Sequence, residues 1–251
     1  MLIMGILNVT PDSFADGGRH NDFDAAVARG LEMIAEGVDI IDIGGESTRP
    51  GAERVSEAEE IERTIPVIAE LAKHGVKISI DTMRASTAEV AIKAGASIIN
   101  DVSGGLADPH MLQTAARLGV PYIAMHWRGQ SKDMNSKAIY SDVVIDVISE
   151  LQERITAALD AGIEVGNLII DPGLGFAKDA EHNWEIIDSI DSFVDLGYPV
   201  LVGASRKRFL GGDSPDEREQ ATIDLTKRLA TTGVWAVRVH SVKPHKEVLA
   251  Q

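Results

Sequence analysis

The sequence predicts an α/β fold, a single (β/α)8 TIM barrel with long loops at its C-terminal rim. Short apolar segments alternate with segments of helical spacing along the whole chain, and there are eight of the apolar segments. The length of 251 residues is close to the roughly 250 residues typical of this barrel. Because no change in composition marks a linker, we expect one domain over residues 1–251.

The predicted strands are almost continuously apolar, as burial on both faces of a parallel sheet requires. They lie at residues 2–9, 38–44, 76–81, 96–102, 121–126, 167–172, 199–204 and 235–240. An open, doubly wound sheet is the alternative that the same alternation allows. That fold is disfavoured because no GxGxxG sequence follows the first strand.

The predicted helices lie between these strands, and several of them end in a glycine that suits a helix C-terminus. The clearest are at residues 24–37, 56–75, 86–95, 142–162 and 217–233. Two connecting segments, 44–56 and 127–141, are long for a barrel of this kind. We expect them to contribute to the C-terminal rim.

The composition excludes several classes of function. Lys and Arg number 24 against 39 Asp and Glu, giving a net charge of −15, so a nucleic-acid partner or an anionic membrane is not expected. The chain has no cysteine, which excludes thiolate metal sites and thiol nucleophiles. No segment approaches the roughly 20 apolar residues of a membrane span. The N-terminus is typical of a strand, not of a signal peptide, so we expect a cytoplasmic protein.

Polar side chains lie at or just beyond the C-terminal ends of the predicted strands, where a parallel barrel places its active site. They are Asn8, Asp42, Asp81, Asn100, Asp101, His126, Asp171, Lys207, Arg238 and His240, with Glu46, Thr48 and Arg49 in a following loop. Asp42 and Asp101 precede turns and are expected only to fix loops. His126 is predicted to be a packed or hydrogen-bonded rim residue, and Glu46 and Asp12 are predicted to be caps.

The chemistry of this rim suits a ligand with two different ends. The carboxylates of Asp81 and Asp171 and the amide of Asn100 can pair with an amino-pyrimidinone edge of a heterocycle. The cationic residues suit a phosphate or diphosphate; they are Arg49, Lys207, Arg238 and His240. The amide oxygen of Asn8 is the kind of neutral ligand that Mg²⁺ accepts beside substrate phosphates.

Eight short motifs spread over nearly the whole chain together resemble the dihydropteroate synthase family. They are GILNVTPDSFADGG at 5–18, DIIDIGGESTRPGA at 39–52, ISIDT at 78–82, IINDVSG at 98–104, MH at 125–126, IIDPGLGF at 169–176, LVGASRKRFLG at 201–211 and RVH at 238–240. The resemblance implies a barrel transferase of folate biosynthesis, a cytoplasmic homodimer. Its substrates would be (7,8-dihydropterin-6-yl)methyl diphosphate and 4-aminobenzoate, joined through a pterin-methylene cation with loss of diphosphate.

The resemblance also assigns roles to individual residues. Pterin binding is implied for Asp81, Asn100, Asp171 and Lys207. Diphosphate binding is implied for Arg238 and His240. Contacts with aminobenzoate are implied for Phe176, Ser205 and Lys207. Thr48 and Arg49 match a mobile substrate-binding loop, and Asn8 matches the asparagine linked to Mg²⁺. The catalytic residues would be Asp81, Lys207, Arg238 and His240.

The basic sequence SRKR at 205–208 is unusual in so acidic a chain. The resemblance places Lys207 in the site, and surface ion pairs are expected for the neighbouring arginines, for Arg208 at least. Three positions or segments depart from the commoner family pattern: Ser241 stands in place of aspartate, Ala15 in place of serine, and segment 211–220 is short. Two alternatives remain open, a noncatalytic pterin-binding homologue and a pterin-binding barrel methyltransferase with a corrinoid partner.

Overall fold

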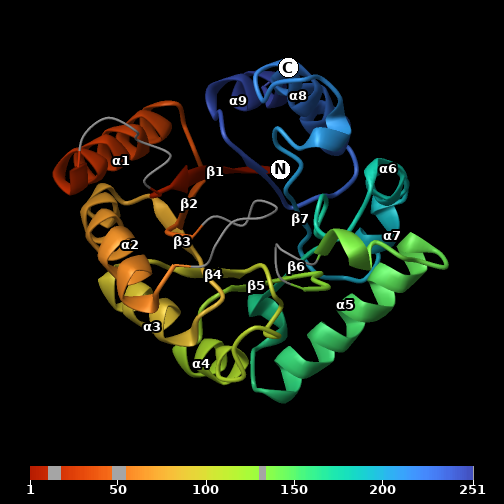
Figure 1. The fold of residues 1–251 in the computed structure, drawn as a ribbon, viewed down its shortest axis with the longest axis horizontal. Coiled ribbons are helices and arrows are strands. Elements are labelled where there is room, and N and C mark those ends of the chain that lie inside the picture. Colours follow the sequence, from red (N-terminus) through yellow and green to blue (C-terminus); the bar gives the residue numbers. More distant parts are fainter. Residues whose placement is uncertain (11–17, 47–54, 130–133, 251) are drawn as a thin grey trace.

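The eight strands form one closed parallel barrel surrounded by helices (Figure 1). The computed structural model describes residues 1–10, 18–46, 55–129 and 134–250. The strands are hydrogen-bonded in the order β6-β5-β4-β3-β2-β1-β8-β7. A parallel bridge between Ile170 and Val200 joins β6 to the chain entering β7, which closes the sheet. The predicted barrel is therefore confirmed.

Each strand lies inside one of the apolar segments predicted from the sequence. The strands are β1 (Leu2–Asn8), β2 (Ile40–Gly44), β3 (Lys77–Asp81), β4 (Ile98–Asp101), β5 (Tyr122–Met125), β6 (Leu168–Asp171), β7 (Leu201–Val202) and β8 (Ala236–Val239). They are shorter than the apolar segments because several of those segments continue into the connecting loops. All neighbouring strands are parallel, so their C-terminal ends meet at one rim.

The helices cover the outside of this barrel. They are α1 (Gly18–Ala35), α2 (Glu57–Leu71), α3 (Ala85–Ala94), α4 (Met111–Leu118), α5 (Val143–Asp160), α6 (Ala180–Asp188), α7 (Ile190–Val194), α8 (Glu217–Leu229) and α9 (Lys243–Leu249), with short 3-10 turns η2 (Ala72–His74), η3 (Met134–Lys137), η4 (Val165–Asn167) and η5 (Arg208–Leu210). Ser56 and Asp142 cap α2 and α5 with their side-chain oxygens, which satisfies amide groups at these helix starts. Of the described helices, none is long and apolar enough to cross a membrane.

The strand register explains how an apolar interior becomes a polar rim. An inner layer of the barrel consists of Met4, Ile40, Ile98, Ile123, Ile169, Leu201 and Ala236. Since side chains two positions apart point to the same side of a strand, the next inward layer contains Asp42, Asn100, Asp171 and Arg238. Asp81 joins them because it pairs in register with Asn100. The core therefore ends in a ring of charged and amide side chains.

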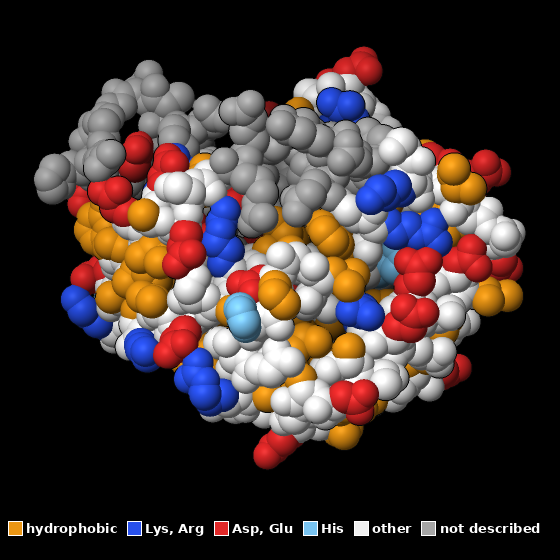
Figure 2. Space-filling model, turned by 60° about the horizontal axis from the view of Figure 1, so that its bottom comes forward, with side chains coloured by type: hydrophobic (Ala, Val, Ile, Leu, Met, Phe, Trp, Pro, Cys, Tyr) orange, Lys and Arg blue, Asp and Glu red, His pale blue; other side chains and the backbone are white. Residues whose placement is uncertain are grey.

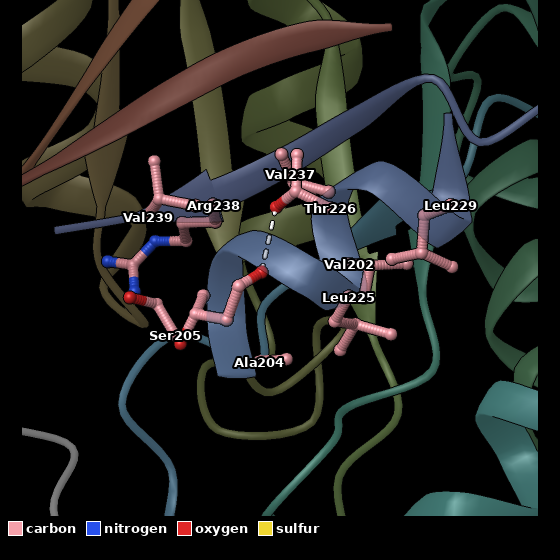
Figure 3. A pocket seen from close by; sticks show the side chains of 10 residues that line it. Val202, Ala204, Ser205, Leu225, Thr226, Leu229, Val237, Arg238 and Val239 are labelled. Atoms are coloured by element: carbon pink, nitrogen blue, oxygen red, sulfur yellow. Dashed lines mark hydrogen bonds between the residues drawn. The ribbon is translucent and has the colours of Figure 1, made fainter. Parts of the chain in front are cut away.

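One small cavity lies in the packing between the barrel and its outer helices. A cavity of about 10 Å³ lies between β7, β8 and α8, and Figure 3 shows the aliphatic side chains of Val202, Leu225 and Leu229 around it. A space of this size holds roughly one water molecule. It is too small for a substrate. On the molecular face seen in Figure 2, basic side chains are interspersed with acidic ones.

Candidate active site

Arg238 lies inside the barrel mouth between two buried carboxylates. Its Nε donates to Asp42 Oδ2 at 2.6 Å, and its Nη2 donates to Asp81 Oδ2 at 2.8 Å. Asp42 is fully buried and Asp81 is 8% exposed. Strands β2, β3 and β8 thus bring together three residues that are far apart in the sequence. Each carboxylate balances part of the guanidinium charge, as buried charges require.

Asp42 also binds the amide of Asn100. Asn100 Nδ2 donates to Asp42 Oδ2 at 3.0 Å, so one carboxylate oxygen holds both the arginine and the asparagine. The other oxygen, Asp42 Oδ1, is buried and has no hydrogen-bond partner among the described residues. The expectation that Asp42 only fixes a loop was therefore wrong. Its side chain points inward because Asp42 lies two positions after Ile40, and no local sequence signal shows its partners.

The ionisation of Asp81 is poised near neutral pH. Burial raises the pKa of Asp81 to about 7, opposed by the positive charge of Arg238 and reinforced by the nearby carboxylate of Asp42. Such a carboxyl can change charge within the physiological range. A perturbed carboxyl group at a barrel rim indicates a functional site.

Asp171 and Lys207 form the opposite side of the same mouth. Asp171 Oδ1 accepts from the amide of Gly173 at 2.7 Å, and burial raises the pKa of Asp171, opposed by this hydrogen bond and by Lys207. Burial lowers the pKa of Lys207 to about 8, opposed by Asp171. These two side chains of opposite charge belong to consecutive strand ends, β6 and β7.

The turn after β6 receives the Lys207 side chain. Lys207 Nζ donates to the carbonyl oxygen of Leu174 and lies 4.6 Å from the centroid of the Phe176 ring, a cation–π contact. Gly175 has a φ of 75°, and a Cβ there would lie 2.7 Å from Lys207 Cδ. A side chain at position 175 would therefore displace the lysine.

Phe176 contributes to an apolar wall beside these charges. Met83, Val102 and Met125 form a small buried cluster, and Trp127 and Phe176 pack against it half-buried. The mouth therefore combines charged groups at its floor with an apolar surface at one side. A flat aromatic ligand with polar edges suits such a surface.

Ser205 and His240 are brought together at the ends of β7 and β8. Ser205 Oγ lies 2.9 Å from His240 Nδ1 and accepts from the His240 amide at 3.2 Å. Arg29 of α1 donates to the His240 carbonyl oxygen at 3.2 Å. The pairing fixes the imidazole next to Arg238, two residues earlier on the same strand.

The two arginines of SRKR differ in their roles. Arg206 Nε donates to Glu219 Oε2 at 2.8 Å, and Glu219 also accepts from the hydroxyl of Ser241. Arg208 is exposed and makes no ion pair within the described part of the chain. The ion-pair expectation is confirmed for Arg206 and was wrong for Arg208.

Three other expectations concern residues at the rim. Asp101 accepts from Ser103 and from the Gly105 amide, so its role in fixing a loop is confirmed. His126 is buried and hydrogen-bonded on both ring nitrogens, also as predicted. Glu46 pairs with Arg84 at 2.8 Å, so a structural role is supported for it.

Several predicted residues cannot be placed in this site. Thr48, Arg49, Asp12 and Ala15 lie outside the described residues. Asn8 is among the residues that the structure describes. It ends β1, is half-buried and pairs in register with Gly44. Among residues 1–10, 18–46, 55–129 and 134–250, no three His, Cys, Asp or Glu side chains are grouped to hold a metal ion.

Comparison with known proteins agrees with this geometry. The family model described as "Pterin binding enzyme" matches residues 4–240. The dihydropteroate synthase of Mycobacterium leprae (strain TN) is 48% identical over 257 residues, covering 98% of this chain and 90% of the relative. The chain belongs to the dihydropteroate synthase family. Two solved structures of the Xanthomonas albilineans dihydropteroate synthase are also similar to it.

The first of these structures contains 4-aminobenzoic acid. It has a TM-score of 0.93 and 42% identity, and the match covers 99% of this chain and 90% of that one. The second contains 7,8-dihydropteroate, with a TM-score of 0.90, 39% identity and coverage of 99% and 91%. Family membership and the barrel are thereby established together.

Proposed function

We propose that this chain condenses (7,8-dihydropterin-6-yl)methyl diphosphate with 4-aminobenzoate to give 7,8-dihydropteroate and diphosphate. The observation that carries the proposal is the ring of Asp81, Asn100, Asp171, Lys207 and Arg238 around one barrel mouth. This set offers acceptors, one amide and two cations within a single buried site. Membership of the dihydropteroate synthase family supports the same substrates.

The pterin would lie deepest, with its polar edges toward the acidic residues. Asp171 can accept two parallel N–H bonds from the guanidine-like edge of the ring, because Oδ2 is not used by Gly173 and Oδ1 keeps a second lone pair. Asn100 offers both a donor and an acceptor. The apolar wall formed by Met125 and Phe176 suits the ring face.

The diphosphate would lie toward Arg238 and His240. Arg238 has five N–H donors, and the contacts with Asp42 and Asp81 use two of them. The remaining donors can bind phosphate oxygens. Charge developing on the leaving group would be stabilised by cations that are already in place.

The reaction needs no side-chain nucleophile. The bond between the pterin methylene carbon and the diphosphate oxygen breaks, and its electron pair leaves with diphosphate. The amine nitrogen of 4-aminobenzoate then forms the new C–N bond with its lone pair and gives up one proton to water. The carboxylate of Asp81 would stabilise the positive charge on the pterin methylene between these two steps.

Aminobenzoate would approach beside Phe176, Ser205 and Lys207. The ammonium of Lys207 stands over the Phe176 ring, and the Ser205 hydroxyl is fixed by His240. A benzoate ring packs well against an aromatic side chain. Thr48 and Arg49 would complete this part of the site from the 44–56 loop.

Mg²⁺ fits the donor set at the β1 end, where Asn8 supplies one neutral oxygen. Asn8 would hold Mg²⁺, and the chemistry that this ion would supply is positive charge opposite the leaving group. Mg²⁺ commonly keeps several waters and takes few protein ligands, which agrees with the lack of a carboxylate cluster in the described residues. A homodimer in the cytoplasm is the assembly and location that we propose from the resemblance.

The decisive experiment is steady-state formation of 7,8-dihydropteroate, with and without Mg²⁺, for the wild type and Lys207→Ala. We expect metal-dependent product that falls by about a hundredfold in the variant. Tight binding of the pterin without any product would instead indicate a noncatalytic pterin-binding protein. Methyl transfer from methyltetrahydrofolate to a corrinoid protein would support the methyltransferase alternative.

A further inference from the structure

A row of four polar side chains extends from the site to the outside of the barrel. Lys178 Nζ lies 2.9 Å from His126 Nδ1, and His126 Nε2 lies 2.9 Å from Glu150 Oε2. Arg128 Nε donates to both Glu150 oxygens at 3.1 Å. Lys178 is 8% exposed and His126 is 1% exposed. None of the roles assigned above uses Lys178.

The hydrogen bonds of Lys178 account for all three donors of an ammonium group. Besides His126, it donates to the carbonyl oxygens of Gly173 at 3.0 Å and Phe176 at 3.1 Å. When Lys178 is an ammonium group it has no lone pair, so His126 Nδ1 then accepts and Nε2–H donates to Glu150. Burial and the charge of Lys178 lower the pKa of His126 to about 4, which keeps the ring neutral.

The two carbonyl groups held by Lys178 belong to the turn that shapes the aminobenzoate site. This turn, residues 172–178, carries the Phe176 ring, and the carbonyl of Leu174 between them accepts from Lys207. The turn is pressed against the end of β5, because a Cβ at Gly173 would lie 2.4 Å from the His126 carbonyl oxygen. Lys178 therefore connects the end of β5 and α5 to the turn whose Leu174 carbonyl accepts from Lys207.

We propose that Lys178, oriented by His126 and Glu150, is a positioning residue that fixes turn 172–178 and thereby aims Phe176 and Lys207 at aminobenzoate. The proposal rests on the function given above and names a determinant of its second substrate. Lys178 is not a catalytic residue, since its three donors are used within the protein. Lys178 acts on the aminobenzoate site by holding turn 172–178 in place.

The kinetic test compares Lys178→Met with Lys93→Met, a matched change at a surface lysine paired with Glu89. We expect Lys178→Met to raise KM for 4-aminobenzoate by about tenfold and lower kcat by about tenfold, as small misplacements of reacting groups do. KM for the pterin diphosphate should rise by less than KM for 4-aminobenzoate, because Asp81 and Asn100 are not touched and the turn meets Asp171 through the Gly173 amide. Equal rises in both KM values, or no change in either, would overturn the proposal.

Substitutions of His126 test whether Lys178 needs the Nδ1 acceptor. In His126→Asn the amide oxygen replaces Nδ1 as the acceptor for Lys178, whereas His126→Leu removes it. We expect near wild-type KM for aminobenzoate in the first variant and the Lys178→Met defect in the second. A similar defect in both variants would indicate a general packing role and contradict the proposal.

A measurement without turnover separates this inference from the proposed function. Hydrogen exchange of the peptide covering 172–178 should be faster in Lys178→Met than in wild type, while exchange in α8 stays unchanged. If wild type makes no dihydropteroate, the proposed function is wrong. The exchange difference still tests whether Lys178 holds turn 172–178. Unchanged exchange in 172–178 would overturn it.

Discussion

Arg238 and Asp42 are joined across the barrel mouth by a 2.6 Å hydrogen bond from Nε to Oδ2, although 196 residues separate them in the chain. The same carboxylate oxygen accepts from Asn100. Asp42 thus orients one residue proposed to bind diphosphate and one proposed to bind the pterin. Because Asp42 is fully buried, it would influence the substrate through these two residues.

Replacing Asp42 with asparagine should reduce activity without unfolding the protein. The amide keeps the shape of the side chain but removes the charge that balances Arg238, so the guanidinium should move toward Asp81. We expect kcat/KM for the pterin diphosphate to fall by about thirtyfold, equivalent to roughly 2 kcal/mol. Steady-state kinetics measure this, and Asp188→Asn at an exposed ion pair is the matched control. Wild-type kinetics in Asp42→Asn would show that the pairing is not needed.

The activity should depend on pH with a narrow maximum. Asp81 has a raised pKa of about 7, so its carboxylate is lost as the pH falls below this value. Lys207 has a lowered pKa of about 8, so its ammonium is lost as the pH rises above it. If both charged forms are needed, kcat/KM should rise toward pH 7 and fall beyond pH 8.

Two variants show which residue causes each limb of the profile of kcat/KM against pH. Lys207→Arg should move the alkaline limb to higher pH, because a guanidinium stays charged. Burial also lowers the pKa of Lys178 to about 7, and a limb that disappears in Lys178→Met would belong to that residue instead. The affinity for a pterin that carries no diphosphate, measured by calorimetry, should also fall on the acidic side. This result would exclude titration of the leaving group as the cause of the acidic limb.

The strands could be predicted because they are almost continuously apolar, and the polar rim could be predicted because polar residues stand where these apolar segments end. An apolar residue such as Ile169 or Ile98 lies inside, and the polar residue two positions later, Asp171 or Asn100, must share its side. The position of a residue on the rim is therefore local information. The short helix α4, at Met111–Leu118, did not stand out because eight residues give little more than two turns of periodicity.

The partners of these residues could not be predicted in the same way. The bond between Asp42 and Arg238 depends on β2 and β8 lying on either side of β1, which only the closed barrel fixes. The hydrogen bond between Lys178 and His126 could not be predicted either, since it depends on the path of the turn after β6. Side-chain pairing between distant strands is set by tertiary geometry, and no spacing in the sequence records it.

A buried ion pair beside the 44–56 loop should be a large contributor to stability. Glu60 is 1% exposed and accepts from Arg84, while Thr82 donates to its other oxygen at 2.6 Å. Glu60→Ala would leave Arg84 with Glu46 as its carboxylate partner and would remove the acceptor of the buried Thr82 and Thr87 hydroxyls, so we expect the free energy of unfolding to fall by about 3 kcal/mol. Urea denaturation measures this change. Glu153→Ala on the exposed face of α5 should change it by less than about 0.5 kcal/mol; similar values for the two variants would refute the role of the pair.

The dependence of the reaction on Mg²⁺ should require both Asn8 and the diphosphate, because both would supply oxygen ligands. Asn8 is the one metal ligand that we propose from the protein, so Mg²⁺ should bind weakly to the enzyme alone and more tightly once diphosphate supplies further oxygens. Chelation with EDTA should abolish product formation, and added Mg²⁺ should restore it.

Asn8→Ala should then raise the Mg²⁺ concentration needed for half-maximal rate by about tenfold, the loss of roughly 1.4 kcal/mol. Asn167→Ala, before the start of β6 at the opposite end of the barrel, is the control and should respond like wild type. Calorimetry of Mg²⁺ binding in the presence of diphosphate gives the same comparison without turnover. If Asn8→Ala binds Mg²⁺ as wild type does, the metal is held by the substrate alone, and Asn8 serves only to end β1.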